Sequence, residues 1–178
     1  MITSEEEREL VEKAIRGDQE AFEQLIQPLL TPAMRLAYAT IGDRAAAEDA
    51  LQDAVLIAWR KLGNVRPDAP LRPWFFAVVA RRSRRLRLSL RRTFATEESA
   101  QTEPDLPAVD AADRIDLWRA VTRLSPRLRQ LVVLRYYMDL TLADSAAIAG
   151  IPVGTAKSRL NRALEKLRLD VAVEAYGV

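Results

Sequence analysis

The feature that most constrains the fold is the spacing of the apolar residues, which recur at helical intervals along almost the whole chain. The clearest case is the segment from Asp43 to Leu62. Its apolar stripe consists of Ala47, Ala50, Leu51, Ala54, Val55, Ala58 and Leu62. A helix with such a stripe has to bury it against a partner. Because alanine and leucine are abundant and β-branched residues sparse, the sequence predicts an all-α protein.

Capping and helix-breaking residues divide the first half of the chain into helices. We expect these helices to cover 4–16, 20–41, 43–62 and 74–92. Ser4 and Glu7 have the spacing of a capping box at the start of the first helix. Pro28 and Pro32 should kink or split the second helix, since proline lacks the backbone N–H group. Three prolines predict a loop over 63–73.

The acidic stretch from Thr93 to Ala112 separates two domains. It contains Pro104 and Pro107 and has no sustained periodicity, which is typical of a flexible linker. The sequence therefore predicts two small helical domains, 1–92 and 113–178, joined by the acidic flexible linker 93–112. The helices expected in the second domain cover 113–123, 126–138, 142–149 and 153–171.

The net charge of +2 hides a strong segregation of charge along the chain. Seven arginines and no acid lie between Arg81 and Arg92. Glu97 to Asp116 holds seven acids and one arginine, and nine basic residues against three acids follow between Arg123 and Arg168. Two basic blocks separated by an acidic strip indicate two modules that face nucleic acid. Solvated helix faces are the alternative interpretation.

Cysteine and histidine are both absent, which removes the usual residues of several kinds of site. Disulfides, common structural zinc sites, thiol nucleophiles and imidazole bases are excluded. We therefore expect no catalytic residues, no metal and no cofactor. The amino terminus is acidic and does not resemble a signal peptide. No run of about 18 apolar residues could cross a bilayer, so we expect a cytoplasmic protein without membrane insertion.

A helix-turn-helix is predicted near the carboxyl end. Thr141 and Asp144 have the spacing of a helix cap with its reciprocal acid. Gly150 can end that helix in the left-handed conformation, and Pro152 is well placed to open the next helix. The result is a short helix, a tight turn and a second helix.

The second of these helices has an apolar side and a polar side. The apolar side consists of Val153, Ala156, Leu160, Ala163, Leu164 and Leu167. The outward residues are Lys157, Ser158, Asn161, Arg162 and Glu165. A helix that presents Lys, Ser, Asn and Arg from its first turns suits reading of the DNA major groove. An ordinary surface helix in an α-hairpin is the alternative.

Strings of residues in both halves resemble one known family. In the second half they are 151–160, Arg162-Ala163, Leu167-Arg168, Leu124-Ser125-Pro126-Arg127 and 133–137. In the first half they are 21–25, 47–54, 58–62 and 71–92. These strings, in this order over nearly the whole chain, resemble the extracytoplasmic-function (ECF) sigma factors of bacterial RNA polymerase. The resemblance implies a promoter-reading subunit that binds the core polymerase and directs transcription initiation.

The resemblance also implies roles for particular residues. The helix of Asp49, Gln52, Asp53, Leu56 and Arg60 would dock on the clamp helices of the largest polymerase subunit. These residues share one helix face opposite the core stripe, and a leucine there favours an interface over a solvated acidic face. The flap of the second-largest subunit is a further expected partner.

The minus-ten element, melted to its non-template strand, is expected on the fourth helix. Arg81, Arg84, Arg85 and Arg92 form one stripe suited to phosphates. The resemblance implies that Arg72, Phe76, Arg81, Arg84 and Arg85 hold the melted strand, with flipped bases stacking or entering pockets. Trp74, at the start of this helix, is expected in the core.

The minus-thirty-five element would be read as duplex by Lys157, Ser158, Arg159, Asn161 and Arg162. Family members are usually inhibited by an anti-sigma factor, so the resemblance implies such a partner here. Two alternatives remain at this point. The chain could be a free-standing helix-turn-helix regulator that binds operator DNA without polymerase, or a hydrolase with Asp49 and Asp53 as paired carboxylates.

Overall fold

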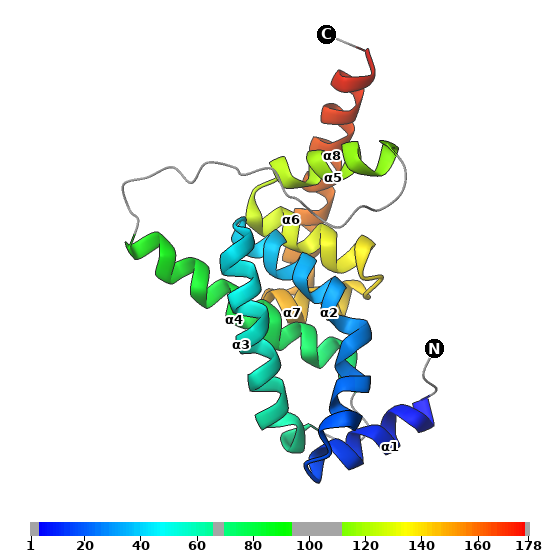
Figure 1. Cartoon of the computed structure of the whole chain (residues 1–178). Helices are drawn as coiled ribbons and strands as arrows, with labels where there is room; N and C mark the ends of the chain where they lie inside the picture. Colours follow the sequence, from blue (N-terminus) through cyan, green and yellow to red (C-terminus); the bar gives the residue numbers. More distant parts are fainter. Residues whose placement is uncertain (1–3, 66–69, 94–111, 177–178) are drawn as a thin grey trace.

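The computed structural model describes residues 4–65, 70–93 and 112–176, and every regular element within these ranges is helical (Figure 1). The amino-terminal bundle comprises α1 (Ser4–Ile15), α2 (Gln19–Ile41), α3 (Arg44–Lys61), a 3-10 turn (Leu62–Asn64) and α4 (Leu71–Thr93). The carboxyl-terminal bundle comprises α5 (Ala112–Arg123), α6 (Pro126–Val132), a π-helical turn (Val133–Tyr137), α7 (Leu142–Ala149) and α8 (Val153–Tyr176). The expected all-α class is therefore confirmed, while most of the expected linker, 94–111, lies outside the described residues.

The core of the amino-terminal bundle lies where α2, α3 and α4 pack on one another. Leu36, Phe75 and Phe76 are among its fully buried side chains. The predicted apolar stripe of α3 faces this core: Ala47, Ala50, Ala54 and Ala58 are all fully buried. Such small side chains let α2 and α4 approach α3 closely, which gives a compact support for the outer face of α3.

The start of α1 differs from the expected capping box. Ser4 is already a helical residue, and a carboxylate oxygen of Glu7 accepts a hydrogen bond from the backbone N–H of Leu71 at 3.2 Å. Glu7 thus satisfies an N–H group at the start of α4, where no intrahelical partner exists. The negative charge also lies favourably at that end of the helix dipole.

Near prolines, an expected split of a helix is absent and one helix boundary was predicted wrongly. α2 is one helix of 23 residues that includes Pro28 and Pro32, so it is not split. Pro28 lies on the exposed side, where water can hydrate the carbonyl that lacks a donor. α4 begins at Leu71 and not at Trp74, which puts Pro73 in its first turn, where a missing N–H group has no cost.

The two bundles pack against each other (Figure 1). α2 lies against α6 and the π-helical turn, and α4 lies against α7. The helix-turn-helix therefore rests directly on the arginine-rich helix of the first half, an arrangement that the sequence did not predict.

Candidate nucleic-acid and protein interfaces

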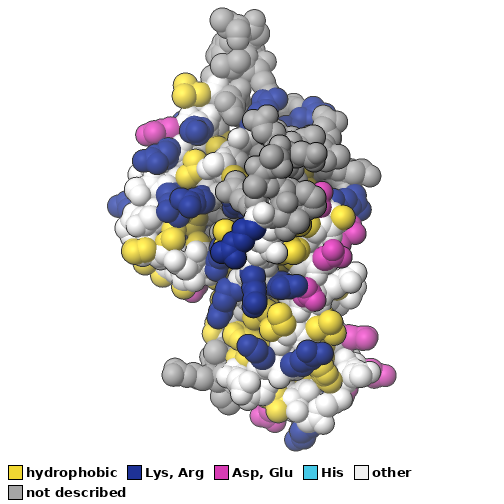
Figure 2. Space-filling model, turned by 90° about the vertical axis from the view of Figure 1, so that its left-hand side faces the viewer, with side chains coloured by type: hydrophobic (Ala, Val, Ile, Leu, Met, Phe, Trp, Pro, Cys, Tyr) yellow, Lys and Arg dark blue, Asp and Glu magenta, His cyan; other side chains and the backbone are white. Residues whose placement is uncertain are grey.

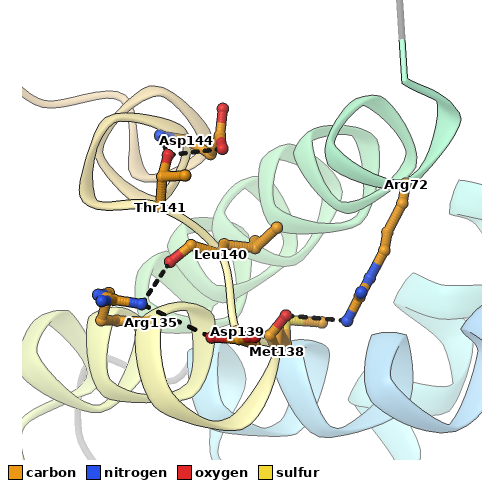
Figure 3. Close-up of polar contacts among 7 residues, drawn as sticks. All are labelled: Arg72, Arg135, Met138, Asp139, Leu140, Thr141 and Asp144. Atoms are coloured by element: carbon orange, nitrogen blue, oxygen red, sulfur yellow. Dashed lines mark hydrogen bonds and ion pairs between the residues drawn. The ribbon is translucent and has the colours of Figure 1, made fainter.

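The turn of the helix-turn-helix is built as the sequence predicted. Oγ1 of Thr141 accepts a hydrogen bond from the N–H of Asp144 at 3.0 Å and donates one to its carboxylate at 2.6 Å (Figure 3). Gly150 ends α7 at a φ of +68°, the left-handed conformation that glycine adopts without strain. α8 starts three residues later, so the turn fixes the direction of the second helix relative to the first.

The outer face of α8 is exposed along its first turns. Lys157, Ser158, Asn161 and Arg162 are exposed, Arg159 is half-buried, and Oγ of Ser158 donates to the carbonyl of Thr155 at 3.0 Å. The inward residues Ala156, Leu160, Ala163 and Leu167 are buried as expected. Val153 is the exception, with 48% of its surface exposed, because it is the first residue of α8 and precedes the part that packs on the core. We call the five polar residues the recognition face.

The outer face of α3 is also exposed. Asp49, Gln52 and Arg60 are exposed, and Leu56 exposes 53% of its surface. Asp53 is half-buried because its carboxylate accepts hydrogen bonds from Arg82 of α4, one of them from Nε at 2.8 Å. The five residues that share this side of α3 therefore lie together, and we call them the α3 face.

The arginine stripe of α4 is only partly exposed. Arg81, Arg85 and Arg92 are exposed, and Nε of Arg81 is 3.4 Å from the carbonyl of Ala77. Figure 2 shows Lys and Arg side chains gathered across the middle of one face of the molecule. A row of guanidinium groups without an acid among them suits a phosphate backbone.

Arg84 points at the carboxyl-terminal bundle. Its Nη1 donates a hydrogen bond to the carbonyl of Ile148 in α7 at 2.8 Å. Burial lowers the pKa of this guanidinium, and the like charge of Arg81 lowers it further. Arginine nevertheless stays charged at neutral pH, so Arg84 brings a full positive charge to the end of α7.

Arg72 makes a similar contact at the start of α4. Its Nη2 donates to the carbonyl of Met138 at 2.8 Å (Figure 3), and its guanidinium carbon lies 5.7 Å from the ring centroid of Phe76. Phe76 itself is fully buried, so its ring cannot stack on a base in this arrangement. We therefore leave Phe76 out of the DNA surface. Trp74 packs partly buried against the core, as expected.

Sequence reasoning missed two arginines that lie between the bundles. Arg35 of α2 is 8% exposed, and its guanidinium carbon lies 4.4 Å from the ring centroid of Tyr137. Arg129 of α6 is equally buried, and burial lowers its pKa while the neighbouring Tyr38 of α2 raises it. The available signal was a charged residue within an otherwise apolar run, since Arg35 is directly followed by Leu36 and Ala37.

The described residues contain neither a cluster of acids that could hold a metal ion nor a helix long and apolar enough to cross a membrane. The structure thus has three surfaces that bear on function: the recognition face, the α3 face and the arginine stripe. This combination defines a two-part helical protein of the DNA-binding class, with a further exposed face suited to a protein partner.

Comparisons with known proteins give the family. The model of Sigma-70 region 2 matches residues 22–93 and the model of Sigma-70, region 4 matches residues 120–169. The ECF RNA polymerase sigma factor SigM of Mycobacterium tuberculosis is 32% identical over 163 residues, which cover 89% of this chain and 81% of SigM. SigL of the same organism is 36% identical over 145 residues, covering 77% of this chain and 81% of SigL.

A solved structure supports the same assignment. The sigma factor RpoE of Bartonella quintana, crystallised with the anti-sigma factor NepR, superposes with a TM-score of 0.72 at 28% identity, covering 85% of this chain and 97% of RpoE. The chain belongs to the ECF sigma factors of RNA polymerase, as the sequence motifs predicted.

Proposed function

We propose that this sigma factor uses its three surfaces for three partners in transcription initiation. The α3 face docks on the clamp helices of core polymerase, the arginines of α4 hold the melted non-template strand of the minus-ten element, and the recognition face reads the minus-thirty-five element as duplex. The second bundle also contacts the polymerase flap. The functional units are 1–92 and 113–178, joined by 93–112, and they act in the cytoplasm with the polymerase.

The observation that carries this proposal is that the exposed polar faces lie within the regions that the sigma-factor family models match. Each surface lies within a matched region, and most of its polar residues are exposed while the opposite side of the same helix is buried. A free-standing operator-binding regulator would need the recognition face but would have no use for Leu56 exposed beside Asp49 and Asp53. Paired carboxylates of a hydrolase are not favoured either, because Asp53 is paired with Arg82.

We also propose that an anti-sigma factor inhibits this chain, since the RpoE structure contains one. Such a partner would have to cover the polymerase-binding face, the DNA-binding surfaces or both. A pull-down with the α3 face substituted would show whether it uses that face.

Run-off transcription with core polymerase and a promoter library tests the proposed function directly. We expect transcripts that depend on the chain and share two upstream elements. Arg162→Ala should lose about 1 to 3 kcal/mol of discrimination at the minus-thirty-five element, which is about 5- to 150-fold in relative output. Lys166→Ala, an exposed residue of α8 outside the recognition face, is the matched control and should keep wild-type selectivity.

A chain that never associated with core polymerase, yet bound duplex DNA specifically by itself, would contradict the proposal. That result would favour the free-standing regulator. Equal promoter selectivity of Arg162→Ala and Lys166→Ala would contradict the assignment of the recognition face alone.

A further inference from the structure

Gly154 lies in the first turn of α8, the helix that carries the recognition face. It is exposed, and it precedes Ser158 by four residues and Asn161 by seven. Residues at these spacings lie on one side of a helix. Gly154 therefore lies on the same side of α8 as these two members of the recognition face, at the end nearest the turn.

The chain itself gives no reason for a glycine at this position. Gly154 has no positive φ, and a Cβ atom there would meet no atom of the described residues within 4 Å. Three of the other described glycines have a positive φ, and a Cβ at Gly63 would meet a neighbouring side chain at 3.9 Å. Glycine also destabilises a helix relative to alanine, because more backbone freedom is lost. Neither conformation nor packing within the described residues therefore accounts for Gly154.

The polar side chains that follow Gly154 on this side of α8 are short. Oγ of Ser158 donates to the carbonyl of Thr155 at 3.0 Å, which holds the hydroxyl close to the helix. Asn161 carries its amide group directly on Cβ. Such side chains touch base edges only when the helix backbone lies deep in the major groove. At that depth, a side chain at position 154 would stand between the backbone of α8 and the DNA.

We propose that α8 makes its closest approach to the edges of the minus-thirty-five base pairs at Gly154, and that DNA fills the space which a side chain would occupy. Gly154 is thus a positioning residue, which sets the depth at which Ser158 and Asn161 meet the bases. The inference rests on the proposed function for the assignment of the recognition face to duplex DNA. Its consequence is that DNA binding weakens as the side chain at position 154 grows, although the helix does not become less stable.

Two substitutions of increasing size test the close approach. Gly154→Ala and Gly154→Leu both introduce a residue that favours a helix, so neither should lower the free energy of unfolding in urea. Both should weaken binding of the holoenzyme, formed by the full chain and core polymerase, to a duplex promoter fragment that the wild type selects from a library. We expect about fivefold weaker binding for alanine, the lower end of the cost of one good base contact, and at least about tenfold for leucine.

Two controls place the loss at the DNA. Gln24→Leu introduces an exposed leucine in α2, outside the three surfaces and without a change of charge, and it should bind the fragment as the wild type does. The affinity of each Gly154 variant for core polymerase alone should equal that of the wild type. A loss that is larger for leucine than for alanine is the mark of a steric cause.

Wild-type binding by both Gly154 variants, with weaker binding by Arg162→Ala, would overturn the close approach and leave the proposed function in place. Wild-type binding by Arg162→Ala as well would refute the assignment of the recognition face, and the inference with it. Weaker binding together with a lower free energy of unfolding would also overturn the inference, since damage to α8 would then explain the loss.

Discussion

Tyr38 shows how a single buried side chain depends on its surroundings. It lies in α2 and is 5% exposed. Burial raises the pKa of its hydroxyl, the charge of Arg129 lowers it to a lesser extent, and Asp43 raises it again. The folded chain therefore favours the neutral phenol more strongly than the unfolded chain does.

This shift gives stability a dependence on alkaline pH. Because the folded pKa lies above the unfolded value of about 10, the contribution of Tyr38 is fully present below pH ~10 and is lost as the pH rises through the folded pKa. We expect the free energy of unfolding in urea to fall more steeply above this pH in the wild type than in Tyr38→Phe. The control is Tyr136→Phe, an exposed tyrosine, which should follow the wild type; identical curves for all three chains would contradict the assignment.

At the scale of the element, the turn between α7 and α8 depends on one backbone conformation. Gly150 has a φ of +68°, whereas Gly154, in the first turn of α8, has no positive φ and no atom within 4 Å of a Cβ at its position. The two glycines are four residues apart but play opposite roles. One permits a conformation that other residues avoid, and the other lowers the stability of a helix.

Alanine substitutions should separate these two roles. We expect Gly150→Ala to lower the free energy of unfolding by about 1 kcal/mol or more, since a side chain in the left-handed region is strained. Gly154→Ala should be neutral or raise it by up to about 1 kcal/mol, because alanine favours the helix. Thermal and urea unfolding of both variants is the measurement, and a loss of equal size in both would refute the explanation.

The end of α2, the start of α3 and both ends of α7 were predictable because their causes are local. The side chains of Asp43 and Thr141 cap the starts of α3 and α7. Gly42 ends α2 and Gly150 ends α7, each in the left-handed conformation. Each of these features involves residues within about four positions along the chain. Which side chains of α3 and α8 face outward could be predicted from the spacing of apolar residues, because that spacing is also a local property.

Contacts distant in sequence were not predictable from these patterns. The continuity of α2 through Pro28 depends on packing against α3 and α4, which outweighs the propensity of proline. The burial of Phe76 and the contact of Arg84 with Ile148, 64 residues away, likewise depend on how the elements meet. A stripe of arginines predicts binding to a polyanion, but the same side chains can also donate to a backbone carbonyl of their own chain, as Arg84 does.

At the scale of the whole molecule, the surfaces differ in how accessible they are before any partner arrives. Four of the five residues of the α3 face, Leu56 among them, are exposed, while Arg84 is engaged with α7. On the proposed function, the α3 face is therefore available to polymerase in the chain as it stands.

Leu56→Asp tests whether the α3 face binds polymerase, as proposed. Burying a charge in place of the Leu56 side chain against a partner is unfavourable, so we expect the variant to lose binding to core polymerase by at least tenfold. Arg44→Ala, an exposed residue at the start of α3 outside the α3 face, should behave as wild type; loss of binding in both variants would indicate general damage to α3.

The bond from Leu71 to Glu7 spans 64 positions and ties the first helix to the helix of the arginine stripe. A product translated from the internal Met34 would therefore lose α1 and with it the hydrogen bond to the start of α4. The shortened product would lack the carboxylate that accepts from the first amide of α4, and it would lack residues 19–33 of α2, including the buried Phe22, Leu25 and Ile26. Such a product would keep the arginine stripe, but α4 would have lost the hydrogen bond from the N–H of its first residue, Leu71, to Glu7.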